Sequence, residues 1–235
     1  MLINNNEISD TVIFAKKMNF NKLYTFLREL QKNNSKEWMD ANRNYYYEVR
    51  DSYIRWLDQM DIRLAEVDPN YTHTTGKQAI NRINNNLLYH PNKPIYKDHF
   101  GAGLDQETKQ GDFYIHLGPS ESFIAGGFYK PKSSILKSIR QAIDYNGDEF
   151  LEIINKPSFK KLFGNLVDDG DSLKTSPKGY SQEHRYIKLL RKKTFAVQHD
   201  LTQKIVTAPD FEDKVIEIYK EMLPFRSYLN QAVSV

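Results

Sequence analysis

The sequence contains no cysteine. Disulfide bonds, thiol nucleophiles and cysteine-ligated zinc or iron–sulfur centres are therefore excluded from its chemistry. Long apolar runs are also missing, since no segment approaches the roughly 18–20 apolar residues that a membrane-spanning helix needs. Residues 1–17 lack the apolar core of a signal peptide. These absences predict a cytoplasmic protein with no membrane partner, in which residues 1–17 form a polar leader.

A strong charge of one sign is missing too. The chain has 33 Lys and Arg against 30 Asp and Glu, a formal charge of +3. A dedicated nucleic-acid-binding protein carries a more concentrated basic surface than this. Aromatic residues, by contrast, are abundant, with 15 Tyr and 13 Phe. Because a tyrosine combines a large apolar ring with a hydroxyl that needs a partner, many of these rings are expected at the margin of the core or in a cleft.

Recognisable cofactor and nucleophile motifs are absent from the sequence. Gly101-Ala102-Gly103 lacks a third glycine and precedes no helix, so it is not a dinucleotide-binding loop. We find no phosphate-binding loop and no nucleophile elbow around a serine. The six histidines do not form the spaced pairs that hold zinc. The sequence therefore predicts no cofactor and no metal site.

The hydrophobic patterns define a sequence of secondary-structure elements. Helical spacing predicts helices over 20–30, 35–66, 133–145 and from 211 to about 222, with two short helices around 148–163 and a separate final turn beginning at Pro224. Period-two alternation predicts strands over 98–104, 112–118, 121–129 and 192–200, and 171–175 is a candidate edge strand. Ser35 is placed to cap the second helix, and Gly126-Gly127 predicts a bulge or a close backbone approach in the third strand.

The order of these elements predicts the fold class. Helices come first, strands cluster in the middle, and the pattern lacks the strand–helix–strand alternation of a parallel sheet. A tight turn at 118–120 makes the second and third strands an antiparallel hairpin. With no repeat and no linker, residues 18–235 are expected to form a single α+β domain. Its mainly antiparallel central sheet would be flanked by N-terminal, middle and C-terminal helices.

The best candidate for a functional site is the segment from Ile80 to Pro131, where polar and aromatic residues are densest. Basic side chains there can neutralise an anionic group through charge-assisted hydrogen bonds, although lysines on a surface loop are commonly just solvated. We expect a binding domain with a cleft for a small anionic ligand between the 112–129 hairpin and the 80–100 segment. The predicted ligand-binding residues are Arg82, Lys93, Tyr96, Lys97, Tyr114 and His116.

Two alternatives remain open at this stage. In the first, the protein is an enzyme that uses His116 or His99, which can meet across paired strands, as a general base. Asp98 adjoins His99, but neighbouring residues of a strand point to opposite faces. In the second, nucleic acid or a protein partner binds the basic strip 178–193, in which aromatic residues are interleaved.

Several short segments, in this order, resemble an uncharacterised bacterial family grouped as domain of unknown function 2461. The resemblance covers about residues 20–232 and implies a compact cytosolic α+β protein with no established activity. The segments that carry it are Asn33-Asn34 with Glu37-Trp38, Arg82-Ile83, Lys93 with Tyr96-Lys97, Ala125-Gly126-Gly127-Phe128-Tyr129, Arg140 with Ile143-Asp144, Pro177-Lys178-Gly179-Tyr180, and Pro224 to Leu229.

The sequence departs from the family pattern in one loop. Where the family usually carries an Arg-Asp pair and a further Arg, this chain has Asn85, Asn86 and Leu88. A carboxamide does not ionise to take up a proton. An acid–base or ion-pair role implied by the family's charged residues therefore does not carry over to these positions.

Overall fold

The computed structural model of the protein describes residues 17–108 and 110–233. Residues 1–16 of the predicted leader lie outside the described residues. Lys17 lies inside them, and its Nζ donates a hydrogen bond to the Pro209 carbonyl over 3.2 Å.

The N-terminal part is a pair of packed helices, α1 (Phe20–Lys32) and α3 (Arg43–Ala65), joined through the short α2 (Lys36–Ala41). Ser35 caps α2 as predicted, since its Oγ accepts the Trp38 amide over 3.1 Å. The prediction of one continuous helix over 35–66 is wrong at Asn42. There the backbone leaves helical geometry (φ −107°, ψ 19°), and the Asn42 side chain donates to the Trp38 carbonyl over 2.9 Å. Asparagine favours such local bonds over continuation of a helix.

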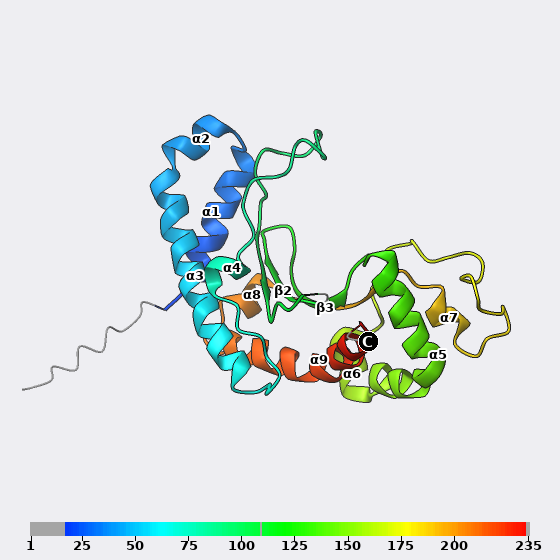
Figure 1. The fold of residues 1–235 in the computed structure, drawn as a ribbon. Helices are drawn as coiled ribbons and strands as arrows, with labels where there is room; N and C mark the ends of the chain where they lie inside the picture. The colour runs from blue at the N-terminus through cyan, green and yellow to red at the C-terminus, as the bar shows by residue number, and fades with distance from the viewer. Residues whose placement is uncertain (1–16, 109, 234–235) are drawn as a thin grey trace, which may run out of the picture.

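The centre of the molecule is a four-stranded antiparallel sheet in the order β1-β2-β3-β4, which confirms the predicted α+β class (Figure 1). The strands are β1 (Phe100–Leu104), β2 (Phe113–Leu117), β3 (Ser122–Phe128) and β4 (Phe195–Asp200). A short α4 (Gly76–Ala79) precedes the sheet. Between β3 and β4 the chain forms α5 (Ser133–Asn155), α6 (Pro157–Phe163) and α7 (Ile187–Leu190), and it ends with α8 (Gln203–Val206) and α9 (Phe211–Val233).

Two of the sequence-based boundaries need correction, and one is confirmed. Residues 171–175 form no strand. The helix predicted over 133–145 breaks where expected, at the non-helical Asn146 of α5 (φ −138°, ψ 49°), where the Tyr228 hydroxyl donates to the Asn146 carbonyl over 3.0 Å. The second part of α5, up to Asn155, and α6 are the two short helices predicted around 148–163. Pro224 starts no separate turn, because it lies inside α9. Burial of the flanking Met222 and Phe225 holds that helix together across the proline.

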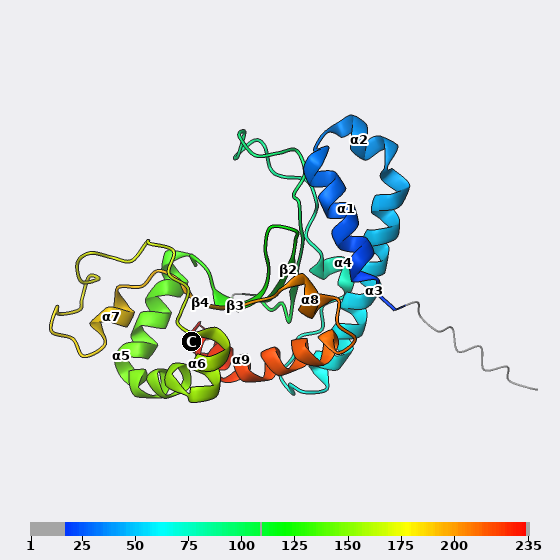
Figure 2. The same cartoon turned by 180° about the vertical axis from the view of Figure 1, so that it is seen from behind.

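One face of the sheet belongs to the hydrophobic core. Phe113, Ile115 and Leu117 of β2 alternate toward that face, and all three are fully buried. Helix α9 runs along the same side of the molecule, below the sheet in Figures 1 and 2. Gly126 permits this approach, since a Cβ there would lie 2.2 Å from the Met222 sulfur. The strand pairing stays continuous through Gly126-Gly127, so the predicted feature is a close approach and not a bulge.

Both outer edges of the sheet receive a backbone hydrogen bond from an irregular segment. At β1, the Asn81 amide donates to the Gly101 carbonyl over 2.7 Å, and Ile80 forms an isolated bridge with Ala102. At β4, the Val167 amide donates to the Ala196 carbonyl over 2.8 Å. Neither edge is left as a bare row of backbone groups.

A buried ion pair connects α9 to the loop that follows β1. Arg226 is 2% exposed, and its guanidinium donates to the Asp105 carboxylate over 2.7 Å and to the Gly111 carbonyl over 2.8 and 3.2 Å. Asp105 has a left-handed backbone (φ 54°) and also accepts bonds from the Tyr219 hydroxyl and the Thr72 amide. Every oxygen of this buried carboxylate therefore has a partner.

We expect Arg226→Met to lower the free energy of unfolding by about 3–5 kcal/mol, because it leaves the Asp105 carboxylate buried without its counter-charge. Urea denaturation measures the loss. Lys220→Met, at an exposed position of the same helix, is the matched control and should change little. Equal stability of the two variants would contradict the assigned role of the ion pair.

At Tyr53 we expect a substitution to raise the free energy of unfolding. It is fully buried, and its hydroxyl has no hydrogen-bond partner among the described residues. Tyr53→Phe should therefore raise the free energy of unfolding by about 1 kcal/mol, since the desolvation cost of the hydroxyl disappears. Tyr219→Phe, which removes hydroxyl bonds to Asp68 and Asp105, should lower it. A clear loss of stability in Tyr53→Phe would show that its hydroxyl is satisfied.

Candidate functional site

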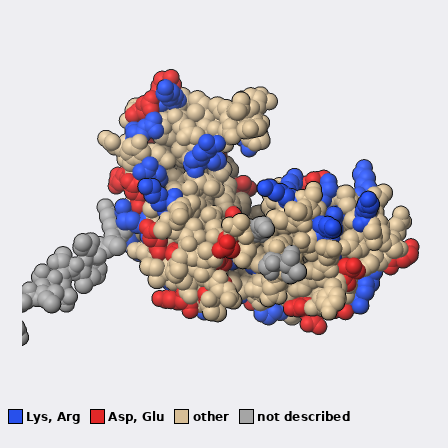
Figure 3. Space-filling view, in the orientation of Figure 1, with Lys and Arg blue, Asp and Glu red and all other residues tan. Residues whose placement is uncertain are grey.

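The outer face of the sheet, opposite the core, carries the largest cavity described in the molecule, about 700 Å³ in volume. We call it the sheet-face hollow. Figure 3 shows the notch that separates the N-terminal helices from the α5–α7 part of the molecule. The floor and walls come from three strands and from the segments that follow β3 and α6. The side chains used below are Asp112, Tyr114, Glu121, Phe123, Ala125, Tyr129, Ile135, Val167, Asp168, Asp169, Ala196 and Gln198.

Small residues make the floor of the sheet-face hollow deep. Ala125 of β3 lies opposite Gln198 of β4, and Gly127 lies opposite Ala196. Gly127 has a positive φ of 100°, and a Cβ there would lie 2.4 Å from the Phe195 carbonyl oxygen. A larger residue at that position is excluded by both backbone geometry and space. The rings of Tyr114 and Phe123 lie beside this strip of small residues, and their centroids are 6.1 Å apart.

Four carboxylates lie around the sheet-face hollow. Partial desolvation raises the pKa of Asp112, and the nearby Asp105 adds to the shift. The Thr194 hydroxyl donates to Asp169 over 2.8 Å and lowers the pKa of that carboxyl, which Lys130 approaches to 3.7 Å. The other two, Glu121 and Asp168, are exposed. The described lining contains no Lys or Arg, so its charge is negative.

Most of the predicted ligand-binding residues lie elsewhere, on or beside a projecting loop. We call residues 84–96 the arm. Lys93, on the arm, and Arg82, just before it, are exposed. Lys97, just after the arm, donates a hydrogen bond from its Nζ to the Arg82 carbonyl over 2.5 Å. Burial lowers the pKa of Lys97, with Arg82 and Lys93 adding to the effect. Tyr96 is buried, and its backbone amide and carbonyl both bond to the Asn34 side chain over 2.9 Å.

The two candidate histidines meet, as expected for paired strands. The ring centroids of His99 and His116 are 3.9 Å apart, and His116 stacks on Phe123 at 4.6 Å. His116 is 7% exposed, and its Nε2 lies 3.7 Å from Glu121. The expectation that Asp98 points away from His99 is wrong. Its Oδ1 lies 3.4 Å from His99 Nδ1, because β1 begins only at Phe100 and strand alternation does not reach Asp98.

The environment of these histidines does not suit a general base. Burial lowers the pKa of His116 to about 4, and the adjacent His99 contributes. Burial also lowers the pKa of His99. A base whose conjugate acid has a pKa near 4 accepts protons poorly at neutral pH. At pH 7 the pair is a neutral aromatic stack at one end of the sheet-face hollow.

The basic strip 178–193 is partly neutralised by acidic neighbours. Arg185 bonds to Asp148 over 2.5 Å, and Lys193 bonds to Asp171 over 2.8 Å. His184 Nε2 also lies 2.9 Å from Asp144. These ion pairs involve two of the six Lys and Arg side chains of the strip, so binding of nucleic acid or a protein partner there stays a prediction.

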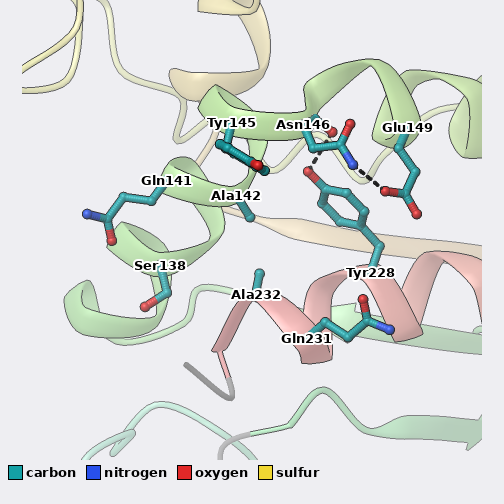
Figure 4. Close-up of a pocket in the computed structure, with 9 residues that line it drawn as sticks. All are labelled: Ser138, Gln141, Ala142, Tyr145, Asn146, Glu149, Tyr228, Gln231 and Ala232. Atoms are coloured by element: carbon teal, nitrogen blue, oxygen red, sulfur yellow. Dashed lines mark hydrogen bonds between the residues drawn. The ribbon is translucent and has the colours of Figure 1, made fainter.

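A second, smaller hollow of about 370 Å³ lies between α5 and α9 (Figure 4). The view shows the Tyr228 hydroxyl directed at the Asn146 backbone and the Asn146 amide directed at Glu149. These polar groups satisfy one another at the helix break. The sheet-face hollow has the greater volume and is lined by four carboxylates against one, and we take it as the candidate site.

Sequence reasoning missed the acidic residues of this site. Asp112 precedes Tyr114 and His116 by two and four positions in the period-two pattern of β2, so it falls on their face of the sheet. That alternation is a usable signal for Asp112. Asp168 and Asp169 follow an irregular segment, and no periodicity in the sequence connects them to the sheet.

The fold and the outer-face hollow define an α+β protein built around an antiparallel meander. Residues 22–228 match the family described as a conserved hypothetical protein (DUF2461), and the chain belongs to that family, as its short motifs predicted. No curated protein and no solved structure matches it. Among the described residues, no helix is both long and apolar enough to span a membrane.

The low pKa of His116 predicts a pH-dependent stability. Between pH 6.5 and 4 the unfolded chain binds a proton at this position while the folded protein does not. The free energy of unfolding should therefore fall by about 3 kcal/mol as the pH drops through this window. Urea denaturation at pH 7, 5.5 and 4.5 measures the slope. His116→Gln should flatten it, whereas His90→Gln, on the exposed arm, should not. Parallel slopes in all three proteins would refute the assignment.

Proposed function

We propose that this protein is a binding domain whose sheet-face hollow holds an amphipathic ligand with a positive charge, such as a protonated amine on an aromatic body. One observation carries the proposal: a cavity of about 700 Å³ combines an aromatic and small-residue floor with carboxylates at its margin. Ligand sites commonly have this form, a mostly apolar concavity with a few placed polar groups.

The aromatic floor supports an apolar ligand body. Tyr114 and Phe123 are only partly buried, and the alanine and glycine strip next to them leaves space over the sheet. A flat ring that enters this space gains apolar burial and contact with the aromatic faces. Ile135 and Val167 form an apolar wall on the α5 side of the same space.

The carboxylates support a positive ligand charge. Desolvation raises the pKa of Asp112, so a cation next to this carboxylate would relieve an existing electrostatic cost. Aromatic faces also attract ammonium groups. The small anionic ligand expected from the sequence depended on Arg82, Lys93 and Lys97. Those residues are not among the residues that line the sheet-face hollow, and for this reason we propose a cationic ligand.

A matched pair of probes tests the sign of the charge. Phenethylamine and phenylacetate share a ring and differ in the charged group, and only phenethylamine should raise the melting temperature. At one hundred times its dissociation constant a ligand stabilises by about 2.7 kcal/mol. For a chain of this length that corresponds to a shift of roughly 5–10 °C. A shift with phenylacetate alone would overturn the proposal.

Two variants locate the binding. Asp112→Asn keeps the shape of the side chain and should weaken phenethylamine binding about tenfold, the equivalent of ~1.4 kcal/mol. Glu152→Gln, an exposed acid on the outer side of α5, is the control and should leave the affinity unchanged. Isothermal titration calorimetry measures both. Equal affinities for the two variants would place the amine outside the sheet-face hollow.

A further inference from the structure

The arm is a projecting loop whose base is held by hydrogen bonds. Asn84 and Tyr96 form a β-bridge at its base, and the Asn85 amide donates to the Ile95 carbonyl over 2.9 Å. The side chain of Asn34, in the link between α1 and α2, binds both the backbone amide and the carbonyl of Tyr96. Figures 1 and 2 both show the arm projecting from the N-terminal helical part, above the sheet, toward the side on which the α5–α7 part lies. Its base is thus anchored while its tip has little covering.

The tip of the arm is unusually apolar for an exposed loop. Eight large hydrophobic side chains are exposed in the described part of the chain, and four of them, Leu87, Leu88, Tyr89 and Ile95, lie on the arm. Leu88 is 84% exposed and Tyr89 is 73% exposed. Single exposed apolar residues are ordinary, but a concentration of them in one projecting loop indicates a surface that another molecule covers.

The charge of the arm has one sign. The chain contains no Asp or Glu from Pro69 to Lys97, and Arg82 and Lys93 are exposed in this region. The sheet-face hollow has the opposite character, with carboxylates at Asp112, Glu121 and Asp168 around an apolar interior. An apolar tip with basic flanks therefore complements an apolar cavity with an acidic margin. Such complementarity sets the orientation and specificity of protein association.

We propose that the arm of one copy of this chain occupies the sheet-face hollow of a second copy, and that the exchange is reciprocal. This inference rests on the proposed function, since the arm tip is itself an amphipathic segment with positive charge. Leu88 and Tyr89 enter the apolar interior, and Lys93 faces the acidic margin. A two-fold axis makes the two junctions identical and closes the assembly as a dimer.

The arm of the same chain does not fill its own sheet-face hollow. No described arm residue lines that cavity. Backbone bonds at the base, including the bond from the Lys97 amide to the Ile83 carbonyl over 2.7 Å, join with the Asn34 side chain to hold the base of the arm against the N-terminal helical part. The arm of a second copy can enter the sheet-face hollow without breaking any of these bonds.

Sedimentation velocity of the full-length chain, over a wide concentration range, tests the exchange. The wild type should dimerise. An arm variant, Leu88→Asp with Tyr89→Ser, and a hollow variant, Ala125→Arg, should each be folded and monomeric. Ile62→Asp replaces an apolar residue that is 59% exposed on α3, remote from the arm in sequence, and should dimerise like the wild type. A monomeric wild type, or a dimeric arm variant, would overturn the inference.

Mixing the two defective proteins provides the sharper test. The hollow variant retains an intact arm and the arm variant retains an intact hollow, so together they form one complete junction. Their mixture should yield a heterodimer with a dissociation constant at least about tenfold above that of the wild-type dimer, because one junction replaces two. A mixture that stays monomeric while the wild type dimerises would show that the dimer uses another surface.

Phenethylamine separates this inference from the proposed function. In the wild-type dimer the arm competes with the amine for the hollow. The arm variant, whose hollow is open, should therefore bind the amine more tightly than the wild type, whereas the hollow variant should not bind it. Amine binding by a monomeric wild type would refute the exchange and leave the proposed function standing. Dimerisation through complementary variants without any amine binding would refute the small-ligand function and leave the exchange standing.

Discussion

The buried pair of Arg226 and Asp105 organises the part of the structure on which the candidate site depends. Arg226 comes from the last helix, Asp105 follows β1, and the same guanidinium binds the Gly111 carbonyl just before β2. The β1–β2 connection is thereby fastened to α9 at both of its ends, and Asp112 is carried to the margin of the sheet-face hollow. Buried ion pairs contribute little net stability compared with apolar packing, but removing one partner is costly. The main effect of the ion pair is therefore to hold the β1–β2 connection in one position relative to α9.

The secondary structure could be predicted where the spacing of apolar residues in the sequence matches the face of the element that is buried. The alternation of Phe113, Ile115 and Leu117 identified β2, and Ser35 identified the start of α2. Local rules failed where tertiary contacts decide the outcome. Pro224 ought to end a helix, yet buried neighbours on both sides keep α9 intact across it. Asn42 belongs to an otherwise helical stripe, and only its bond to Trp38 reveals the break.

The candidate site was predictable only on the strands. Alternation placed Tyr114 and His116 on one face, and His99 joins them there. No periodic pattern in the sequence shows in which direction a loop projects. Asn34 binds the Tyr96 backbone from 62 positions away and thereby fixes the base of the arm that carries Lys93. Because such a long-range anchor leaves no periodic trace, the sequence did not reveal that Arg82, Lys93 and Lys97 lie outside the lining of the sheet-face hollow. Our proposal of a cationic ligand therefore differs from the anionic ligand expected from the sequence.

The covered edges of the sheet have a consequence for how this protein can aggregate or polymerise. Open antiparallel sheets tend to grow by adding strands from other chains, which is the first step toward amyloid-like stacking. Here Asn81 and Ile80 occupy the β1 edge, and Val167 occupies the β4 edge. Each segment satisfies backbone groups at its edge with which a strand from another chain would otherwise pair. Whatever protection the sheet has against added strands therefore comes from two short irregular stretches and not from the strands themselves.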